Sequence, residues 1–154
     1  MHAYVKALKT LFEQNADRVA APAMKQYMRG QFEYLGIKTP QRGALMKELH
    51  AAHPLPQIGG LDAVLRELWA LPEREFQYAG IALLERFERQ LPAGFAETLQ
   101  HLICTKSWWD TVDGIAPAGD TADAEAFADA LGARWTELAG PTSVPDAIST
   151  VLLG

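Results

Sequence analysis

Apolar residues recur at helical spacing along almost the whole chain. Between residues 61 and 69 the apolar positions follow the i, i+3, i+4, i+7, i+8 rule without a gap, which is the pattern of a helix with one buried face. No pair of segments shows the alternation that two adjacent strands require. The sequence therefore predicts an all-α protein. Similar spacing occurs at residues 4–12, 24–28, 45–49, 76–87, 95–103 and 127–138.

Proline and small polar residues mark the joints between the predicted helices. Asp17 is placed to cap a helix that ends at Gly30. Thr39 followed by Pro40 has the order of a hydroxyl cap and a proline at the first helical position. Short helices joined at prolines predict stacked antiparallel hairpins, a HEAT-like repeat superhelix (α-solenoid), rather than a closed bundle. The inner helices of such arrays line a concave surface.

The segment 105–113 predicts a further helix. Ser107 is a candidate N-cap, and Gly114 with Pro117 marks where the helix weakens and stops. The i, i+4, i+7 positions on one face of this helix are apolar, so we expect that face to be buried. That face comprises Trp108, Val112 and Ile115.

Trp109 and Asp113 stand four positions apart and share another face of the same helix. An aromatic plane beside a carboxylate could meet a flat, cationic or electron-poor ligand. Taken singly, Asp113 also fits a structural or surface acid. Other paired acids, such as Glu73 with Glu75, fit capping or solvated positions at a helix start.

Length and composition indicate one soluble globular domain over residues 1–154, in which residues 139–154 form a divergent tail. The first residues lack the apolar run of a secretory signal, and no stretch approaches the roughly 20 apolar residues of a membrane helix. Cys104 is the single cysteine, which excludes a disulfide framework and suits a reducing cytoplasm. We expect a cytoplasmic protein and a packed thiol.

Charge is unevenly distributed along the chain. The net charge is −5, but residues 1–60 hold eight Lys/Arg against four Asp/Glu, whereas residues 61–154 hold six against fifteen. A basic first part can attract phosphate inside an acidic whole, because charges are screened beyond about 10 Å. A solvated helix surface is the alternative explanation.

Three groups of polar residues near helix ends could face a polyanion. The free N–H groups of a helix start suit a phosphate, and basic side chains add to that attraction. Each group on its own also fits an ordinary surface. The groups are Lys38, Thr39 and Arg42; Lys106 with Thr105 and Ser107; and Tyr27 with Lys25 and Arg29.

The sequence offers no metal or cofactor motif. His50 and His53 have metal-like spacing, but no third ligand is evident and Pro54 follows directly. Walker, GxGxxG and GxSxG motifs are absent. We therefore expect no cofactor and no metal.

Several blocks of sequence, in order, resemble the AlkD-like DNA alkylation repair family of bacterial alkylpurine DNA glycosylases. The resemblance covers residues 1 to about 117 and fades through the helix near residues 127–138. Its most specific element is the Lys-Ser-Trp-Trp-Asp string that continues to Val112-Asp113. The blocks are Tyr27-Met28, Leu35-Gly36-Ile37-Lys38-Thr39-Pro40-Gln41-Arg42, Arg66-Glu67-Leu68-Trp69, Leu71-Pro72-Glu73-Arg74-Glu75-Phe76-Gln77 and Thr105-Lys106-Ser107-Trp108-Trp109-Asp110-Thr111-Val112-Asp113.

The resemblance implies HEAT-like helical repeats wrapped around duplex DNA and hydrolysis of the N-glycosidic bond of cationic N3- or N7-alkylated purines. It implies that Trp109 and Asp113 are the active-site pair, and that Tyr27 and the loop around Lys38 lie near the DNA. The expected partner is duplex DNA containing alkylated purines, bound by a monomer.

The resemblance also implies later repeats, one of which supplies an Arg to the active-site pair, and residues 139–154 do not match a repeat start. A fragment, a frame-shifted end and a short homologue would all give this pattern. The alternative function is therefore a non-catalytic HEAT-like module that binds DNA or protein through its concave face.

Overall fold

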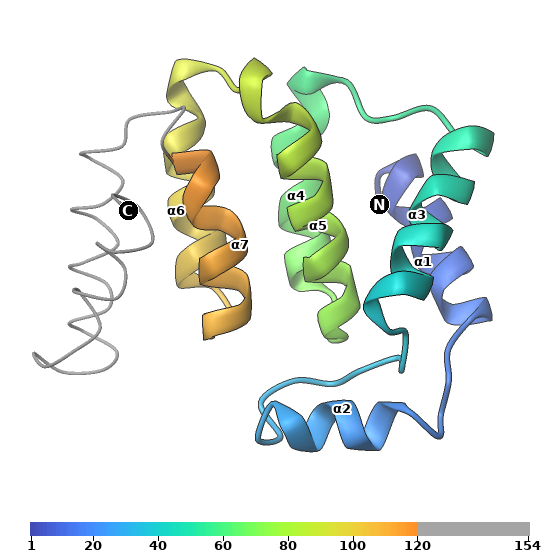
Figure 1. Ribbon diagram of the computed structural model, residues 1–154. Helices are drawn as coiled ribbons and strands as arrows, with labels where there is room; N and C mark the ends of the chain where they lie inside the picture. Colours follow the sequence, from blue (N-terminus) through green and yellow to red (C-terminus); the bar gives the residue numbers. More distant parts are fainter. Residues whose placement is uncertain (120–154) are drawn as a thin grey trace, which may run out of the picture. The chain divides into compact units, whose positions relative to one another are not determined.

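The computed structural model describes residues 1–119, except for the side chains of residues 113 and 116–119 (Figure 1). Helices account for all regular secondary structure in this part of the chain, where Glu33 and Glu73 form an isolated parallel bridge. Three short 3₁₀ helices occupy Ile58–Gly60, Glu88–Gln90 and Ala93–Phe95. The α-helices are α1 (Ala3–Gln14), α2 (Ala21–Tyr27), α3 (Thr39–Ala52), α4 (Leu61–Ala70), α5 (Arg74–Phe87), α6 (Ala96–Cys104) and α7 (Trp109–Gly119).

The chain divides into two compact units, Met1–Gly80 and Ile81–Gly154, and α5 runs from the first into the second. The predicted helix near residues 127–138 and the predicted tail 139–154 lie outside the described residues. The prediction of one domain over residues 1–154 stays a prediction. None of the helices between residues 1 and 119 combines the length and apolarity needed to cross a membrane.

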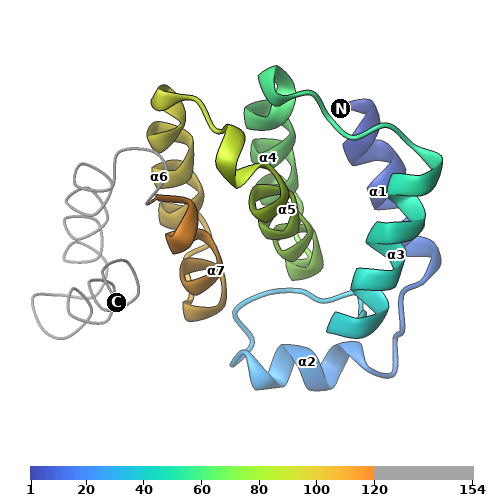
Figure 2. The ribbon, with the colours of Figure 1, turned by 45° about the horizontal axis from the view of Figure 1, so that its top comes forward.

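The core of the first unit is built from the predicted apolar faces. In both ribbon views α1 lies beside α3, and α2 runs crosswise below the ends that it connects (Figures 1 and 2). The rings of Phe12 and Phe76 stack with their centroids 5.8 Å apart. Each fully buried side chain of this size contributes about 1.5–3 kcal/mol. The buried apolar residues of this unit are Tyr4, Val5, Leu8, Phe12, Met28, Ile37, Leu45, Met46, Leu49, Leu61, Val64, Leu65, Leu68, Trp69, Phe76 and Ala79.

A close approach joins α4 to the first turns of α5. A Cβ atom added to Gly80 would lie 2.6 Å from Cζ3 of Trp69, so the two helices pack at a distance that only glycine permits. Gln77 Nε2 donates hydrogen bonds to the carbonyl oxygens of Leu68 and Leu71, at 2.8 and 3.1 Å. The Leu68 carbonyl also accepts from the Leu71 amide at 3.3 Å, so Gln77 adds side-chain hydrogen bonds at the end of α4.

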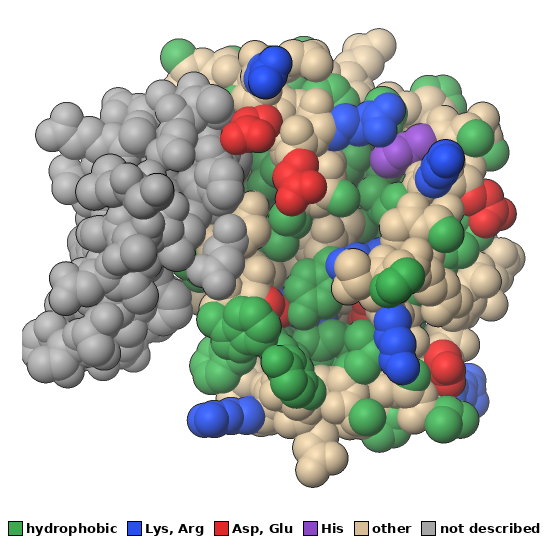
Figure 3. Space-filling model, in the orientation of Figure 1, with side chains coloured by type: hydrophobic (Ala, Val, Ile, Leu, Met, Phe, Trp, Pro, Cys, Tyr) green, Lys and Arg blue, Asp and Glu red, His purple; other side chains and the backbone are tan. Residues whose placement is uncertain are grey.

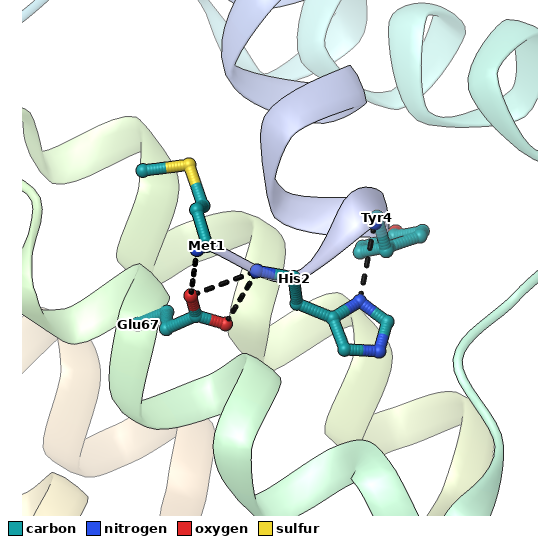
Figure 4. A network of polar contacts seen from close by, with 4 residues as sticks. All are labelled: Met1, His2, Tyr4 and Glu67. Atoms are coloured by element: carbon teal, nitrogen blue, oxygen red, sulfur yellow. Dashed lines mark hydrogen bonds and ion pairs between the residues drawn. The ribbon is translucent and has the colours of Figure 1, made fainter.

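The start of α1 is tied to α4 by a carboxylate (Figure 4). Glu67 accepts hydrogen bonds from the His2 amide at 2.9 and 3.2 Å, and its Oε1 lies 3.8 Å from the Met1 ammonium. His2 Nδ1 in turn accepts from the Tyr4 amide at 3.1 Å and caps α1. Through this network the residues that precede α1 are held against α4.

In the second unit α6 and α7 pack side by side (Figures 1 and 2). Val112 and Ile115 are buried, which confirms the predicted inner face of α7, and Trp108 is half-buried. A Cβ atom on Gly114 would lie 2.9 Å from Cδ1 of Ile81, so the start of this unit also packs closely on α7. The other buried apolar residues of this unit are Ile81, Leu83, Leu84, Phe87, Phe95, Leu99, Leu102 and Ile103.

Three predicted helix boundaries are wrong. Thr39 is the first residue of α3 rather than its cap, and the N-cap residue Lys38 makes no side-chain capping bond. The Ser107 hydroxyl donates to the Ile103 carbonyl and so satisfies the end of α6 instead of capping α7. Helix α7 continues past Gly114 to Gly119. At Ser107 the local capping rule failed because the hydroxyl found a partner on the preceding helix.

The prediction for Asp17 is partly confirmed. Its Oδ1 accepts hydrogen bonds from the amides of Val19 and Ala20, at 2.9 and 3.1 Å. This is the bonding of an N-cap, but it stabilises a turn that precedes α2. Helix α2 itself spans Ala21–Tyr27 and does not reach Gly30.

Candidate nucleic-acid interface

The loop that leads into α3 is anchored by a buried carboxylate. Glu75, in the first turn of α5, is fully buried. Its oxygens accept hydrogen bonds from the Leu35 amide at 2.9 and 3.0 Å, from the Gly36 amide at 2.9 Å and from the Ile37 amide at 3.1 Å. The expectation that Glu75 is a solvated or capping acid is wrong. Its partners lie 38 to 40 residues away, beyond the reach of local patterns.

Gly36 gives this loop its shape. Its φ of +94° lies in the region that favours glycine, and an added Cβ would lie 2.0 Å from the carbonyl oxygen of Asp17. The Asp17 amide donates to the Leu35 carbonyl at 2.8 Å. The loop is therefore held on one side by the turn before α2 and on the other by α5.

Lys38 and Thr39 follow this anchored loop, and both are exposed. Lys38 is the N-cap of α3 and Thr39 its first residue, and the first amides of a helix have no carbonyl partner within it. Pro40 supplies no N–H, so the free donors at this helix start are fewer than in an ordinary helix. The exposed lysine and hydroxyl remain directed to solvent at the end of a fixed loop.

Arg42 occupies a different environment from Lys38. Its guanidinium carbon lies 4.7 Å from the centre of the Tyr78 ring, and the hydroxyl oxygens of Tyr78 and Tyr34 are 3.1 Å apart. Burial lowers the pKa of Arg42, while the nearby Tyr78, Glu75 and Tyr34 act to raise it. Arg42 therefore packs against Tyr78 as well as carrying a charge. Its position in the sequence does not indicate this contact.

The end of α2 presents an aromatic side chain. Tyr27, the last residue of α2, is 77% exposed. The helix closes with a Schellman motif, in which the Arg29 and Gly30 amides donate to the carbonyls of Gln26 and Lys25, both at 2.9 Å. Arg29 has φ +56°, at a position usually taken by glycine.

Basic side chains are visible over α2 and α3 of the first unit (Figure 3). Lys25 is paired with Glu33 at 2.7 Å, with both side chains exposed. No ion pair links Arg29 or Lys38 to another residue within the described part of the chain. These two cations are therefore accessible to an external anion.

In the second unit Trp109 begins α7 and is 54% exposed. Lys106, three residues earlier, is half-buried and has φ +55°, an uncommon conformation for a residue other than glycine. Asp113 lies one turn after Trp109 in the same helix, and its side chain is outside the described residues. The prediction that Trp109 and Val112 lie on different faces of the helix is confirmed, because Val112 is buried while Trp109 is exposed.

The two histidines that have metal-like spacing bind protein partners. His50 Nε2 lies 2.7 Å from the Tyr4 hydroxyl, and His53 Nδ1 lies 3.0 Å from the Pro54 carbonyl oxygen. Among the described residues, no three His, Cys, Asp or Glu side chains gather in a group that could hold a metal ion.

The predicted site residues are therefore divided between the two units. Tyr27, Lys38, Thr39 and Arg42 belong to the first, and Lys106, Trp109 and Asp113 to the second. The sequence missed the support beneath the first group, formed by Glu75, Tyr34 and Tyr78. A weak signal existed for Glu75, which lies in one of the motif blocks that carry the family resemblance.

The described residues form an all-α fold of helical hairpins that exposes aromatic and basic side chains at helix ends. The sequence profile of the DNA alkylation repair enzymes matches residues 8–137. The chain belongs to this family, as its motif blocks predicted, and the family supports a role in DNA repair.

A solved structure has a similar fold. It is that of a predicted DNA alkylation repair enzyme from Enterococcus faecalis, with a TM-score of 0.63 and 22% identity over 90% of this chain and 73% of that chain. At this identity the likeness concerns the fold, and it confirms the predicted all-α arrangement of helical hairpins. A search of curated proteins gave no match.

Proposed function

We propose that this protein hydrolyses the N-glycosidic bond of cationic N3- or N7-alkylated purines in duplex DNA. Membership of the DNA alkylation repair enzyme family supports a DNA substrate. The observation that carries the proposal is the exposure of Trp109, a large aromatic side chain that is 54% accessible at the start of α7. An exposed aromatic side chain offers a flat surface on which a nucleotide can stack.

The chemistry follows from the charge of the damaged base. Water adds to C1′ of the deoxyribose as the bond from C1′ to the purine nitrogen breaks, and the bonding electrons neutralise the cationic base. The base therefore leaves without a general acid. Positive charge develops on the sugar, and a carboxylate beside it lowers the energy of that transition state.

We assign the role of that carboxylate to Asp113, which would also orient the attacking water and accept its proton. Trp109 would cover the sugar with its indole and exclude bulk water. The two positions are four apart in the sequence, a spacing that places residues on one face of a helix. The reaction as written uses no metal and no cofactor.

The DNA contacts that we propose are electrostatic and non-specific in sequence. Lys38, Thr39, Arg42 and Lys106 would contact phosphates, and the exposed ring of Tyr27 would pack on the backbone or sugar. Phosphate contacts position a protein on a duplex without reading its sequence. We propose that a monomer carries out the reaction.

Release of free base from a duplex containing 7-methylguanine tests the proposal. The wild-type protein should release the base, and Asp113→Asn should abolish release while it retains DNA binding. Glu97→Gln, an exposed acid in the first turn of α6, is the charge-matched control and should keep activity. Absence of release by the wild type, or release that survives in Asp113→Asn, would contradict the proposal.

A non-catalytic module that binds duplex DNA is the second candidate. It is favoured by the exposed Tyr27, Lys38 and Thr39 of the first unit, which could bind a duplex without any contribution from Asp113. Salt-sensitive DNA binding without base release would identify this function. Absence of DNA binding even at low salt would leave a protein-binding scaffold instead.

A further inference from the structure

We infer that Glu75 is a positioning residue for DNA binding, because it holds the loop of residues 35–37 in the conformation that presents Lys38 and Thr39. The inference rests on the proposed function, in which those two residues contact phosphates. Glu75 itself does not reach the solvent and would not touch DNA.

Three successive backbone amides converge on one carboxylate. The Leu35, Gly36 and Ile37 amides lie between 2.9 and 3.1 Å from the Glu75 oxygens, with Gly36 and Ile37 buried beside it. Hydrogen bonds to an ionised acceptor are roughly twice as strong as neutral ones. A buried carboxylate without them would be costly, so the loop and the charge stabilise each other.

The same helical turn also fixes the other end of the loop. The Arg74 amide donates to the Glu33 carbonyl at 2.9 Å, and the Arg74 guanidinium carbon lies 3.7 Å from the centre of the Phe32 ring. Arg74 is as fully buried as Glu75. The first turn of α5 therefore holds the segment from residue 32 to residue 37 at both ends.

The anchored segment ends one residue before the proposed DNA contacts. Ile37 is fully buried, and Lys38 is the exposed N-cap of α3 with φ −76° and ψ 161°. Fixing the Ile37 amide thus fixes the point from which the Lys38 side chain extends. A loop that is ordered before binding loses less conformational entropy when the complex forms.

Because Glu75 carries a charge, its electrostatic effect and its positioning effect predict opposite changes in the Kd for DNA. Glu75→Gln removes one negative charge, so electrostatic attraction alone would tighten DNA binding. Loss of positioning predicts the opposite, a Kd weakened roughly five- to thirtyfold, the factor for hydrogen bonds of this kind. Glu73→Gln, a half-exposed acid two residues earlier, changes the charge equally. Its bridge to Glu33 involves the backbone, which this substitution keeps.

The experiment measures the Kd for an undamaged duplex against salt concentration in the wild type, Glu75→Gln and Glu73→Gln, each with and without Lys38→Ala. In the wild type and in Glu73→Gln, Lys38→Ala should weaken binding and reduce the salt slope by about one. In Glu75→Gln the same change should have little further effect. Amide exchange of Leu35, Gly36 and Ile37 without DNA should accelerate only in Glu75→Gln.

A merely stabilising role for Glu75 predicts a lower Tm with the Lys38 effect intact, and that result would overturn the inference. An unchanged or tighter Kd in Glu75→Gln would overturn it also. If the wild type does not bind DNA at all, the proposed function fails first. Should Glu75→Gln lack the helical circular dichroism of the wild type, Glu75→Asp, which keeps the charge but shortens the reach, decides by the same measurements.

Discussion

The Arg42 guanidinium lies over the ring of Tyr78, with 4.7 Å between its carbon and the ring centre. This contact links α3 to α5 within the first unit, and the Tyr78 hydroxyl lies 3.1 Å from that of Tyr34. Arg42 is therefore part of the packing beneath the loop that carries Lys38. The two basic residues, four positions apart, should respond differently to substitution.

We expect Arg42→Ala to lower the free energy of unfolding by about 0.5–2 kcal/mol, because it removes a partly desolvated cation–π contact. Lys38→Ala, at an exposed position, should change it by less than about 0.5 kcal/mol. Urea denaturation of both variants measures the difference. Equal stabilities for the two variants would show that the Tyr78 contact contributes nothing.

Gly80→Ala should destabilise the protein by about 1–3 kcal/mol, the range for overpacking a close contact. The new methyl group would lie 2.6 Å from Trp69 Cζ3 and 3.3 Å from Leu65 Cδ2. Gly43→Ala is the matched control in α3, where nothing lies within 4 Å of the added carbon. That control should stabilise by about 0.5–1 kcal/mol, because alanine favours a helix interior over glycine. Thermal or denaturant unfolding that ranks the two variants in the reverse order would contradict the packing described for α4 and α5.

Trp109→Ala should lower the free energy of unfolding by about 1–2 kcal/mol, less than truncation of a fully buried aromatic, because the side chain is 54% exposed. Release of 7-methylguanine should fall by about a hundredfold, the effect of lost positioning at a reacting centre. Single-turnover kinetics on a damaged duplex measures this change. Val19→Ala, at an apolar side chain that is 89% exposed in the first unit, is the control and should keep full activity.

The Lys9 ammonium lies 2.7 Å from a Glu13 carboxylate oxygen, one turn along α1. The hydrogen bond to Glu13, and then its charge, raise the pKa of Lys9 above the usual 10.5. A raised pKa means that the folded state holds the proton more tightly. The resulting stabilisation is present below pH 10.5 and is lost as the pH rises through the raised value.

Glu13→Gln should therefore lower the pKa of Lys9 toward 10.5. An NMR titration of the lysine side chain measures the value directly. Glu48→Gln, an exposed acid on α3, should leave the Lys9 titration unchanged. A Lys9 pKa that does not respond to Glu13→Gln would mean that the ion pair is absent in solution.

The helical faces could be predicted because they depend on residues three or four apart. Leu61, Leu65 and Leu68 are buried, as their spacing predicts. In α7, Val112 is buried and Trp109 is exposed, as the apolar pattern predicts. Burial of one apolar face is the main driving force for the packing of such helices, so a local period suffices to identify that face.

The supports of the candidate interface could not be predicted in the same way. Glu75 has the sequence context of a first-turn surface acid, yet it binds amides 38 to 40 residues earlier in the chain. Ser107 has the context of a cap for α7 and satisfies α6 instead. Arg42 was predicted only as a DNA contact, and its ring partner Tyr78 comes from another helix. Each of these depends on which segments meet in space.

The left-handed backbone at Gly36 has a consequence for natural variation. Any side chain at this position would collide with the Asp17 carbonyl, whereas Lys38 and Thr39 project into water and can be exchanged without disturbing the fold. In a deep mutational scan for growth under methylating stress, Gly36 should therefore tolerate fewer substitutions than Lys38 or Thr39. Within this segment, a residue away from the proposed phosphate contacts would then be under stronger constraint than the two residues proposed to make them.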